Sequence, residues 1–240
     1  WQAAGTVKIG DRLLGFDEKN GDARPGLRAP TRYRRFAVAT VLSVRRLIKP
    51  SYRLTFSDGT IVIASADHLW LGGSHASGGR GWRWVKTANM VCNRKTQRSW
   101  VLKVCDVVER EESFDAGWIG GFADGEGTLA IGPGLKIDIA QNDGPVLERA
   151  KSLLSMRGAT TYVSGSRKCK HLTISGGKHE QMAFLMRFQP ERLVRKFAAS
   201  CGEVSLYGRE HRAVALVEKE YLGNHEVVAI ETDTHTFIAE

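Results

Sequence analysis

The hydrophobic pattern of this 240-residue chain changes twice, and these two changes limit how the chain can fold. Up to about residue 110, apolar residues form short runs around turn signals such as Asp58-Gly59, which is typical of β-hairpins. From Phe114 onward, apolar residues recur at helical spacing, as over residues 145–156. Short strand patterns return from Val227. The sequence therefore predicts a β domain that is interrupted by an inserted α+β domain.

We predict that residues 1–110 and 218–240 form the two parts of the β domain and that residues 111–217 form the insert. In the first part, strands are expected over residues 37–44, 52–56, 61–64, 82–85 and 100–104. In the insert, helices are expected over residues 114–123, 145–156, 181–188 and 190–199, and strands over 129–131, 136–140, 162–163 and 171–174. The expected order of the insert is α-β-β-α-β-β-α, with a further helix starting near Pro190.

The net charge is +9, and the excess of basic residues lies in the first half of the chain. Residues 1–110 hold 20 Lys or Arg against 8 Asp or Glu, whereas residues 111–217 hold 14 against 12. A basic face is compatible with an ordinary soluble protein, but it also suits a polyanion, and nucleic acid is the commonest such partner.

The cysteines and the hydropathy exclude several classes of protein. The 4 cysteines include no CxxC pair, and no histidine cluster has zinc-site spacing, so we expect neither a structural zinc nor a disulfide framework. No apolar run approaches the roughly 20 residues that span a bilayer, so we expect no membrane partner and a cytoplasmic location.

Three segments share motifs with one family. They are Gly5-Thr6 near the start, residues 58–70 with Ser65 three residues before His68, and residues 227–239. In this order they resemble the conserved blocks of inteins, the protein-splicing elements. The resemblance implies the family's all-β Hint horseshoe, here split by the insert, and flanking host segments (exteins) as partners.

The chemistry of splicing needs residues such as His68 and Ser65. An acyl shift at the splice junction requires a protonated leaving nitrogen and a stabilised oxyanion, and an imidazole and a hydroxyl can supply these. Considered alone, the residues favour a core histidine at position 68 and a turn hydroxyl at Ser65. The family resemblance favours the catalytic reading, with prokaryotic or phage-encoded origin.

Two departures point to the class 3 inteins. Trp1 stands where most inteins have a nucleophilic Cys or Ser, and Trp70 follows His68 by two residues. Class 3 inteins lack the N-terminal nucleophile, carry this tryptophan, and attack the junction with a cysteine whose position here is Ala229. Alanine has no nucleophile, so we expect no splicing as written, whether a cysteine was replaced or the chain naturally carries alanine.

The last motif also contains His235, which matches the family's histidine that assists asparagine cyclisation at the C-terminal junction. A surface histidine at a strand edge is the alternative. The family's His-Asn end is expected a few residues beyond Glu240.

A further motif lies in the insert. Residues 119–127, Ile-Gly-Gly-Phe-Ala-Asp-Gly-Glu-Gly, resemble the LAGLIDADG motif of homing endonucleases. In that family the motif is a helix that packs against a second copy, and Gly120, Gly121 and Ala123 would permit the close approach. Glu126 takes the place of the acid that binds Mg²⁺, the expected cofactor. Asp124 is expected to be a helix-end or interface residue instead. A glycine-rich helix end with a stray acid is the alternative.

The same resemblance suggests Gln141, Arg195 and Lys196 as contacts to site water or DNA phosphate, each with a solvated surface residue as the alternative. Because one motif cannot build two active centres, the resemblance implies a homodimer that cuts double-stranded DNA. Two other functions stay open: a free-standing LAGLIDADG endonuclease or DNA-binding protein, and a splicing domain with an inactive insert.

Overall fold

The computed structural model describes residues 3–17, 34–73, 82–93, 97–166, 169–206 and 212–238. The chain divides into two compact units, of which one is formed by residues 2–104 with 211–240 and the other by residues 105–210. The first part of the β unit ends at residue 104, six residues before the predicted limit of 110. The α+β unit ends at residue 210, seven residues before the predicted limit of 217. The shift has a simple cause: strand pairing, rather than local hydrophobic pattern, decides where each unit ends.

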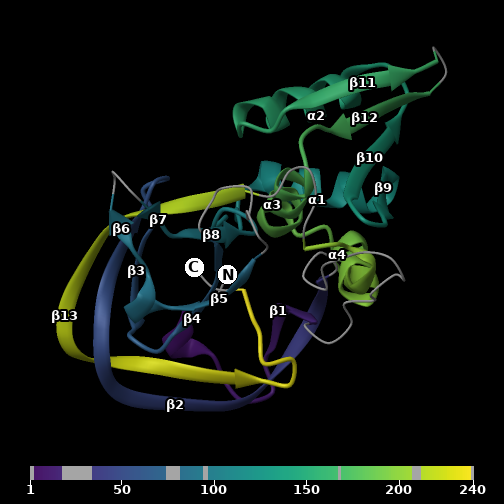
Figure 1. Ribbon diagram of the computed structural model, residues 1–240. Coiled ribbons are helices and arrows are strands. Elements are labelled where there is room, and N and C mark those ends of the chain that lie inside the picture. Colours follow the sequence, from purple (N-terminus) through teal and green to yellow (C-terminus); the bar gives the residue numbers. More distant parts are fainter. Residues whose placement is uncertain are drawn as a thin grey trace, which may run out of the picture. The chain divides into compact units, whose positions relative to one another are not determined.

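The β unit is built on two long antiparallel strands, β2 and β13, which bend together around the rest of the unit (Figure 1). Within the described residues its main sheet has the strand order β1-β2-β13-β8-β4-β5, and β3 also pairs with β2. The strands and short helices are η1 (Ala4–Thr6), β1 (Arg12–Asp17), β2 (Arg35–Phe56), β3 (Ile61–Ser65), β4 (Leu69–Gly73), β5 (Arg83–Lys86), η3 (Thr87–Asn89), β6 (Cys92–Asn93), β7 (Gln97–Arg98), β8 (Trp100–Lys103) and β13 (Arg212–Thr232).

Two expectations about the strands are corrected. Residues 37–44 and 52–56 were expected as separate strands, but both belong to β2. The short strands expected from Val227 to Ala239 belong to β13 only as far as Thr232, and residues 233–238 form no strand. The pattern fails over residues 45–50 because side chains there are largely exposed and follow no two-residue alternation. Bulges let both strands bend, and one of them holds Gly223 at φ +81.

The ends of the β unit are held against each other by hydrogen bonds. The buried Thr236 hydroxyl accepts from Phe16 N at 2.9 Å and donates to Phe16 O at 2.5 Å, and Ile238 N donates to Leu14 O at 2.7 Å. A Cβ at Gly15 would lie 2.6 Å from Thr236 O, so this close approach of two backbones requires glycine. The chain's first and last described segments therefore belong to one body.

The α+β unit has helices packed on one face of an antiparallel sheet of order β11-β12-β10-β9. Strand residues alternate, so that Leu129, Ile137 and Leu172 are fully buried while Thr128 and Lys136 are exposed. Its elements are α1 (Phe114–Glu126), β9 (Gly127–Ile131), β10 (Leu135–Gln141), α2 (Pro145–Met156), β11 (Thr161–Gly165), β12 (Lys170–Ile174), α3 (Lys178–Phe188), α4 (Glu191–Ser200) and η4 (Cys201–Glu203). The helices and strands expected from the sequence are present, most of them slightly longer than predicted.

The α+β unit enters and leaves the β unit at neighbouring points. Lys103 at the end of β8 is the register partner of Arg212 at the start of β13. Cross-strand partners in an antiparallel pair lie about 5 Å apart. A tight turn could therefore connect the same two strands without the insert.

We predict that replacing residues 105–210 by an Asn-Gly turn leaves a folded β unit, because that turn suits a two-residue hairpin between paired strands. Circular dichroism and amide NMR dispersion should show a β protein with one cooperative thermal transition. A chain without dispersed amide signals would contradict the predicted independence of the β unit.

Candidate functional sites

The β3–β4 turn brings three of the predicted residues together. The turn closes with His68 N donating to Ser65 O at 3.0 Å. The Ser65 hydroxyl donates to Asp67 Oδ1 at 2.6 Å, and Lys49 Nζ lies 2.6 Å from Asp67 Oδ2. These bonds, from Lys49 first, hold the pKa of Asp67 below its usual range. The Ser65 hydroxyl thus engages Asp67, a residue of the motif to which the sequence had assigned no role.

His68 stands at the edge of this turn with its ring against an indole. The centroids of the His68 and Trp70 rings lie 4.9 Å apart, and the rings are 70° to one another, an edge-to-face contact. His68 is exposed, and desolvation by the surrounding protein lowers its pKa while the charge of Asp67 acts in the opposite direction. An imidazole can accept or donate a proton near neutral pH, so His68 could exchange a proton with a reacting group.

The Trp70 indole is held by a residue that the sequence did not single out. Trp70 Nε1 donates to Thr87 Oγ1 at 2.8 Å, and Thr87 N donates to His68 O at 2.9 Å. Thr87 is fully buried at the start of η3. A single threonine after a predicted strand carries no pattern, so only the fold could reveal this contact.

Ala229 and His235 belong to the C-terminal part of the β unit. Ala229 is half-buried in β13 and pairs with Arg45, whereas His235 is exposed in the turn after β13, with φ +56. The register partner of Lys49 is His225, four residues from Ala229, which corresponds to about 13 Å along a strand. Among the described residues, no hydrogen bond or ring contact joins Ala229 or His235 to His68 or Trp70. Trp1 lies outside the described residues.

In the α+β unit, Glu126 is the last residue of α1 and its side chain is exposed. The end of α1 is fixed by a reciprocal clamp with α4. The Asp124 carboxylate accepts from the backbone N of Glu191 and Arg192 at 2.6 and 2.9 Å, which caps α4. Arg192 returns bonds to the carbonyls of Asp124 and Gly127 at 2.7 and 2.6 Å. Asp124 therefore acts as a capping residue, and the clamp holds the backbone on both sides of Glu126.

The three residues expected near DNA phosphate have different surroundings. Gln141 ends β10, two residues beyond Ile139, whose register partner is Gly127, so it lies at the sheet end nearest Glu126. The Gln141 side-chain oxygen accepts from Asn142 N at 2.7 Å. Arg195 is exposed and forms an ion pair with Glu191, and Lys196 is exposed one residue further along α4.

The glycines of α1 do not all face the way that the motif suggested. Gly120 and Ala123 are buried, and a Cβ at Gly120 would lie 2.6 Å from Phe188 O in α3. Gly117, Gly121 and Gly125 are exposed instead, and a Cβ at each would meet nothing within 4 Å. Residues four apart share one helix face, so this row of glycines leaves a bare face on α1.

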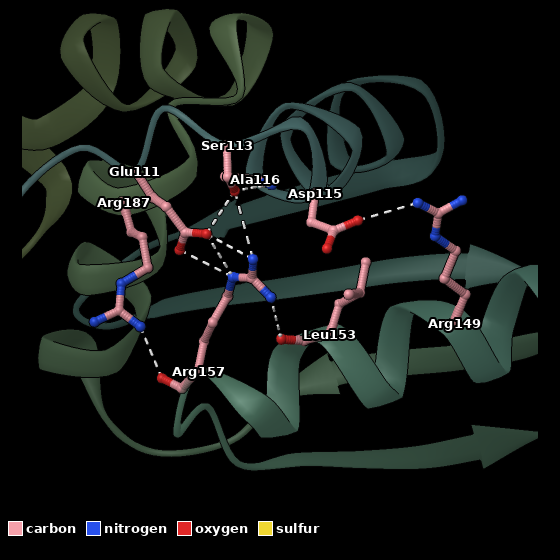
Figure 2. A network of polar contacts seen from close by, with 8 residues as sticks. All are labelled: Glu111, Ser113, Asp115, Ala116, Arg149, Leu153, Arg157 and Arg187. Carbon is pink, nitrogen blue, oxygen red and sulfur yellow. Dashed lines mark hydrogen bonds and ion pairs between the residues drawn. The ribbon is translucent and has the colours of Figure 1, made fainter.

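The start of α1 is anchored by a polar network (Figure 2). The Ser113 hydroxyl accepts from Ala116 N at 3.1 Å and donates to Glu111 Oε1 at 2.6 Å. Arg157 Nε approaches both Glu111 oxygens at 3.0 and 2.9 Å, and its Nη2 lies 2.6 Å from Oε1. Hydrogen bonds from Arg157, then from Ser113, hold the pKa of Glu111 below its usual range. Arg187 joins the network by donating to Arg157 O at 2.7 Å.

Few side chains of the described residues could bind a metal ion together. No group of three or more His, Cys, Asp or Glu gathers within the described part of the chain. Mg²⁺, however, is commonly bound through one or two carboxylates together with substrate phosphates and water. An exposed Glu126 fits such a site only when phosphate or a second copy of the chain supplies further oxygens. None of the described helices is long and apolar enough to cross a bilayer.

Comparison with known proteins found partial similarity to replicative helicases. Over 77 residues, 32% of this chain, the sequence is 40% identical to the replicative DNA helicase DnaB of Mycobacterium intracellulare, covering 11% of that protein. Over 70 residues, 29% of this chain, it is 40% identical to the replicative DNA helicase DnaB of Mycobacterium leprae (strain TN), covering 9%. No family model matches the chain. The matched stretches thus span about a tenth of these helicases.

We predict that Glu111→Gln lowers the free energy of unfolding of the α+β unit by about 1–2 kcal/mol at pH 7, because Arg157 loses its charged partner. A carboxyl whose pKa is lowered on folding stabilises the fold above its ordinary pKa of about 4.3, and this contribution disappears as the pH falls through the folded value. Urea titrations at several pH values should therefore give parent and variant curves that converge in acid. Glu112→Gln, at an exposed neighbouring position, is the control and should change stability by less than about 0.5 kcal/mol. Equal losses for both substitutions would refute the role of the network.

Proposed function

We propose that this chain is a class 3-like intein that carries an inserted LAGLIDADG homing endonuclease. The observation that carries the proposal is the pairing of residues 41–56 with residues 216–232, which unites both motif-bearing ends in one β unit and leaves the α+β unit as an insert. A splicing element needs its two ends in one body, because both junctions react there. A free-standing nuclease has no such need.

The similarity to helicases supports a host of that class. A splicing element lies inside another protein, so similarity confined to about a tenth of a replicative DNA helicase suits an element carried by such a host. The helicase activity itself belongs to those relatives, whose remaining length this chain does not share.

The splicing chemistry assigns a role to each residue of the β3–β4 turn. A cysteine thiolate at position 229 would attack the carbonyl carbon of the junction, forming a thioester while the amide nitrogen leaves with a proton. The imidazolium form of His68, which has taken up a proton from solvent, would deliver that proton, and Trp70 would hold the His68 ring by edge-to-face contact. The Ser65 hydroxyl would keep Asp67 in place through its 2.6 Å hydrogen bond. His235 would assist cyclisation of the terminal asparagine.

We predict that the variant Ala229→Cys, extended by the family's His-Asn end and placed between two reporter segments, ligates the reporters. Electrophoresis and mass spectrometry would detect the ligated product and the excised chain. The parent alanine chain and the double variant Ala229→Cys/His68→Ala are the controls, and each should give less than about one hundredth of the product, since general acid catalysis is typically worth 10²-fold or more. No ligation from the restored chain would reject the splicing function.

The endonuclease part of the proposal requires two copies of the chain. The bare face of Gly117, Gly121 and Gly125 suits close packing of two α1 helices, since small residues let backbones approach. Two Glu126 carboxylates would then hold Mg²⁺ with DNA phosphate oxygens, and the metal would supply Lewis-acid stabilisation of the phosphate charge. Arg195, Lys196 and Gln141 would approach the DNA backbone or site water. The basic first half of the chain would add attraction for DNA.

We predict Mg²⁺-dependent cutting of the uninterrupted host gene and a dimer at micromolar concentration in analytical ultracentrifugation. Gly121→Leu should abolish the dimer without unfolding the monomer, because its side chain enters open space. Glu126→Gln should preserve the dimer and lower cutting by at least about 100-fold, whereas the exposed control Glu203→Gln should do neither. A chain that splices but stays monomeric on DNA and never cuts would favour the second candidate, a splicing domain with an inactive insert.

A further inference from the structure

The hydroxyl of Thr87 lies between the two aromatic residues of the β3–β4 turn. It accepts from Trp70 Nε1 at 2.8 Å and lies 3.4 Å from His68 O, to which it donates. The backbone N of Thr87 bonds to the same carbonyl at 2.9 Å. One fully buried residue therefore contacts both the side chain of Trp70 and the main chain of His68.

The position of the His68 ring depends on the indole. Among the described residues, the imidazole has ring contact with Trp70 at 4.9 Å and no side-chain hydrogen bond. Trp70 itself packs against Phe56, with ring centroids 5.8 Å apart, and is oriented by its single N–H donor. Losing the acceptor on Thr87 would free the indole to rotate, and the imidazole would follow.

The turn that bears Thr87 is anchored from both sides. Ala88 N donates to Ala66 O at 2.9 Å, which ties the turn to the residues before His68. On the other side, Lys219 of β13 donates through Nζ to Ala88 O at 2.7 Å and to Met90 O at 3.1 Å. The C-terminal stretch thus supports the turn through a lysine whose cation also lies 4.6 Å from the centre of the Tyr52 ring.

We infer that Thr87 is a positioning residue of the splicing centre: its buried hydroxyl orients the Trp70 indole, and the indole in turn sets the His68 imidazole. This inference rests on the proposed splicing function. Thr87 touches no reacting atom and acts through Trp70.

The titration of His68 reports on this arrangement. The groups that face the ring are the Asp67 carboxylate, whose charge favours imidazolium, and Lys49, which is paired with Asp67. Desolvation opposes Asp67 and keeps the pKa of His68 lowered. If the indole swings away, water reaches the imidazole, and the pKa of His68 should rise toward its ordinary value.

The test uses NMR of the full chain, with Thr87→Val and Thr87→Ser as a matched pair. In Thr87→Val, the Trp70 indole proton should exchange with water at least about tenfold faster, and the pKa of His68 should rise. Thr87→Ser keeps the hydroxyl and should restore the parent values for both. Thr55→Val, a half-buried strand position of the same unit, controls for the exchange of a hydroxyl for a methyl group.

A double-mutant cycle separates positioning from a general loss of packing. Trp70→Phe should raise the pKa of His68 by itself, and adding Thr87→Val to it should then change nothing further, because the indole through which Thr87 acts is gone. Additive effects, or unchanged indole exchange and His68 titration in a folded Thr87→Val chain, would overturn the inference. If Thr87→Val fails to fold, the His68 titration in Trp70→Phe tests the inference instead. An unchanged pKa of His68 in that variant would then overturn the inference.

The splicing-competent Ala229→Cys chain supplies a functional measurement. There, Thr87→Val should slow attack on the N-terminal junction about tenfold and move the pH dependence of that rate upward with the pKa of His68. Thr87→Ser should splice at the parent rate. Absence of any splicing, together with an intact Thr87–Trp70–His68 coupling by NMR, would reject the proposed function and leave the positioning itself established.

Discussion

The antiparallel pairing of β2 with β13 is the interaction on which the rest of the structure depends. It joins residues 41–56 to residues 216–232, so the α+β unit has to emerge from within the β unit rather than follow it. The entropic cost of closing a chain loop grows only slowly with its length. An insert that folds by itself and leaves at cross-strand neighbours therefore adds little to the cost of forming this sheet.

The same pairing connects the β3–β4 turn to the C-terminal stretch. β2 carries Lys49, which reaches Asp67, and β13 carries Lys219, which supports the turn at Thr87. Charged side chains of both long strands therefore contact the segments that carry His68 and Thr87. The turn at Thr87 is therefore supported by residues of both parts of the β unit.

In the α+β unit, hydrogen bonds from other residues satisfy backbone groups at both ends of α1. Ser113 caps its first turn and is itself held by Glu111 and Arg157 (Figure 2). At the other end, Arg192 donates hydrogen bonds to the carbonyl oxygens of Asp124 and Gly127, while the Asp124 carboxylate caps α4. Both ends of α1 are thus fixed to other helices, although one face of the helix stays bare. Rigid support beside an unpartnered face is what a helix that meets a second copy would require.

The sequence by itself determined the elements of the α+β unit, because its side-chain periodicity matches local geometry, as in α2 over residues 145–156. It also identified Ser65, His68 and Trp70 as one cluster, since residues so close along a turn have to be neighbours. Only the tertiary structure decided the continuity of β2 through its exposed middle and the outward face of α1. It also revealed Thr87, Lys219 and Arg192. These residues act through partners 17 to 131 positions away, and no local pattern encodes such pairings, because they are set by which strands and helices come together.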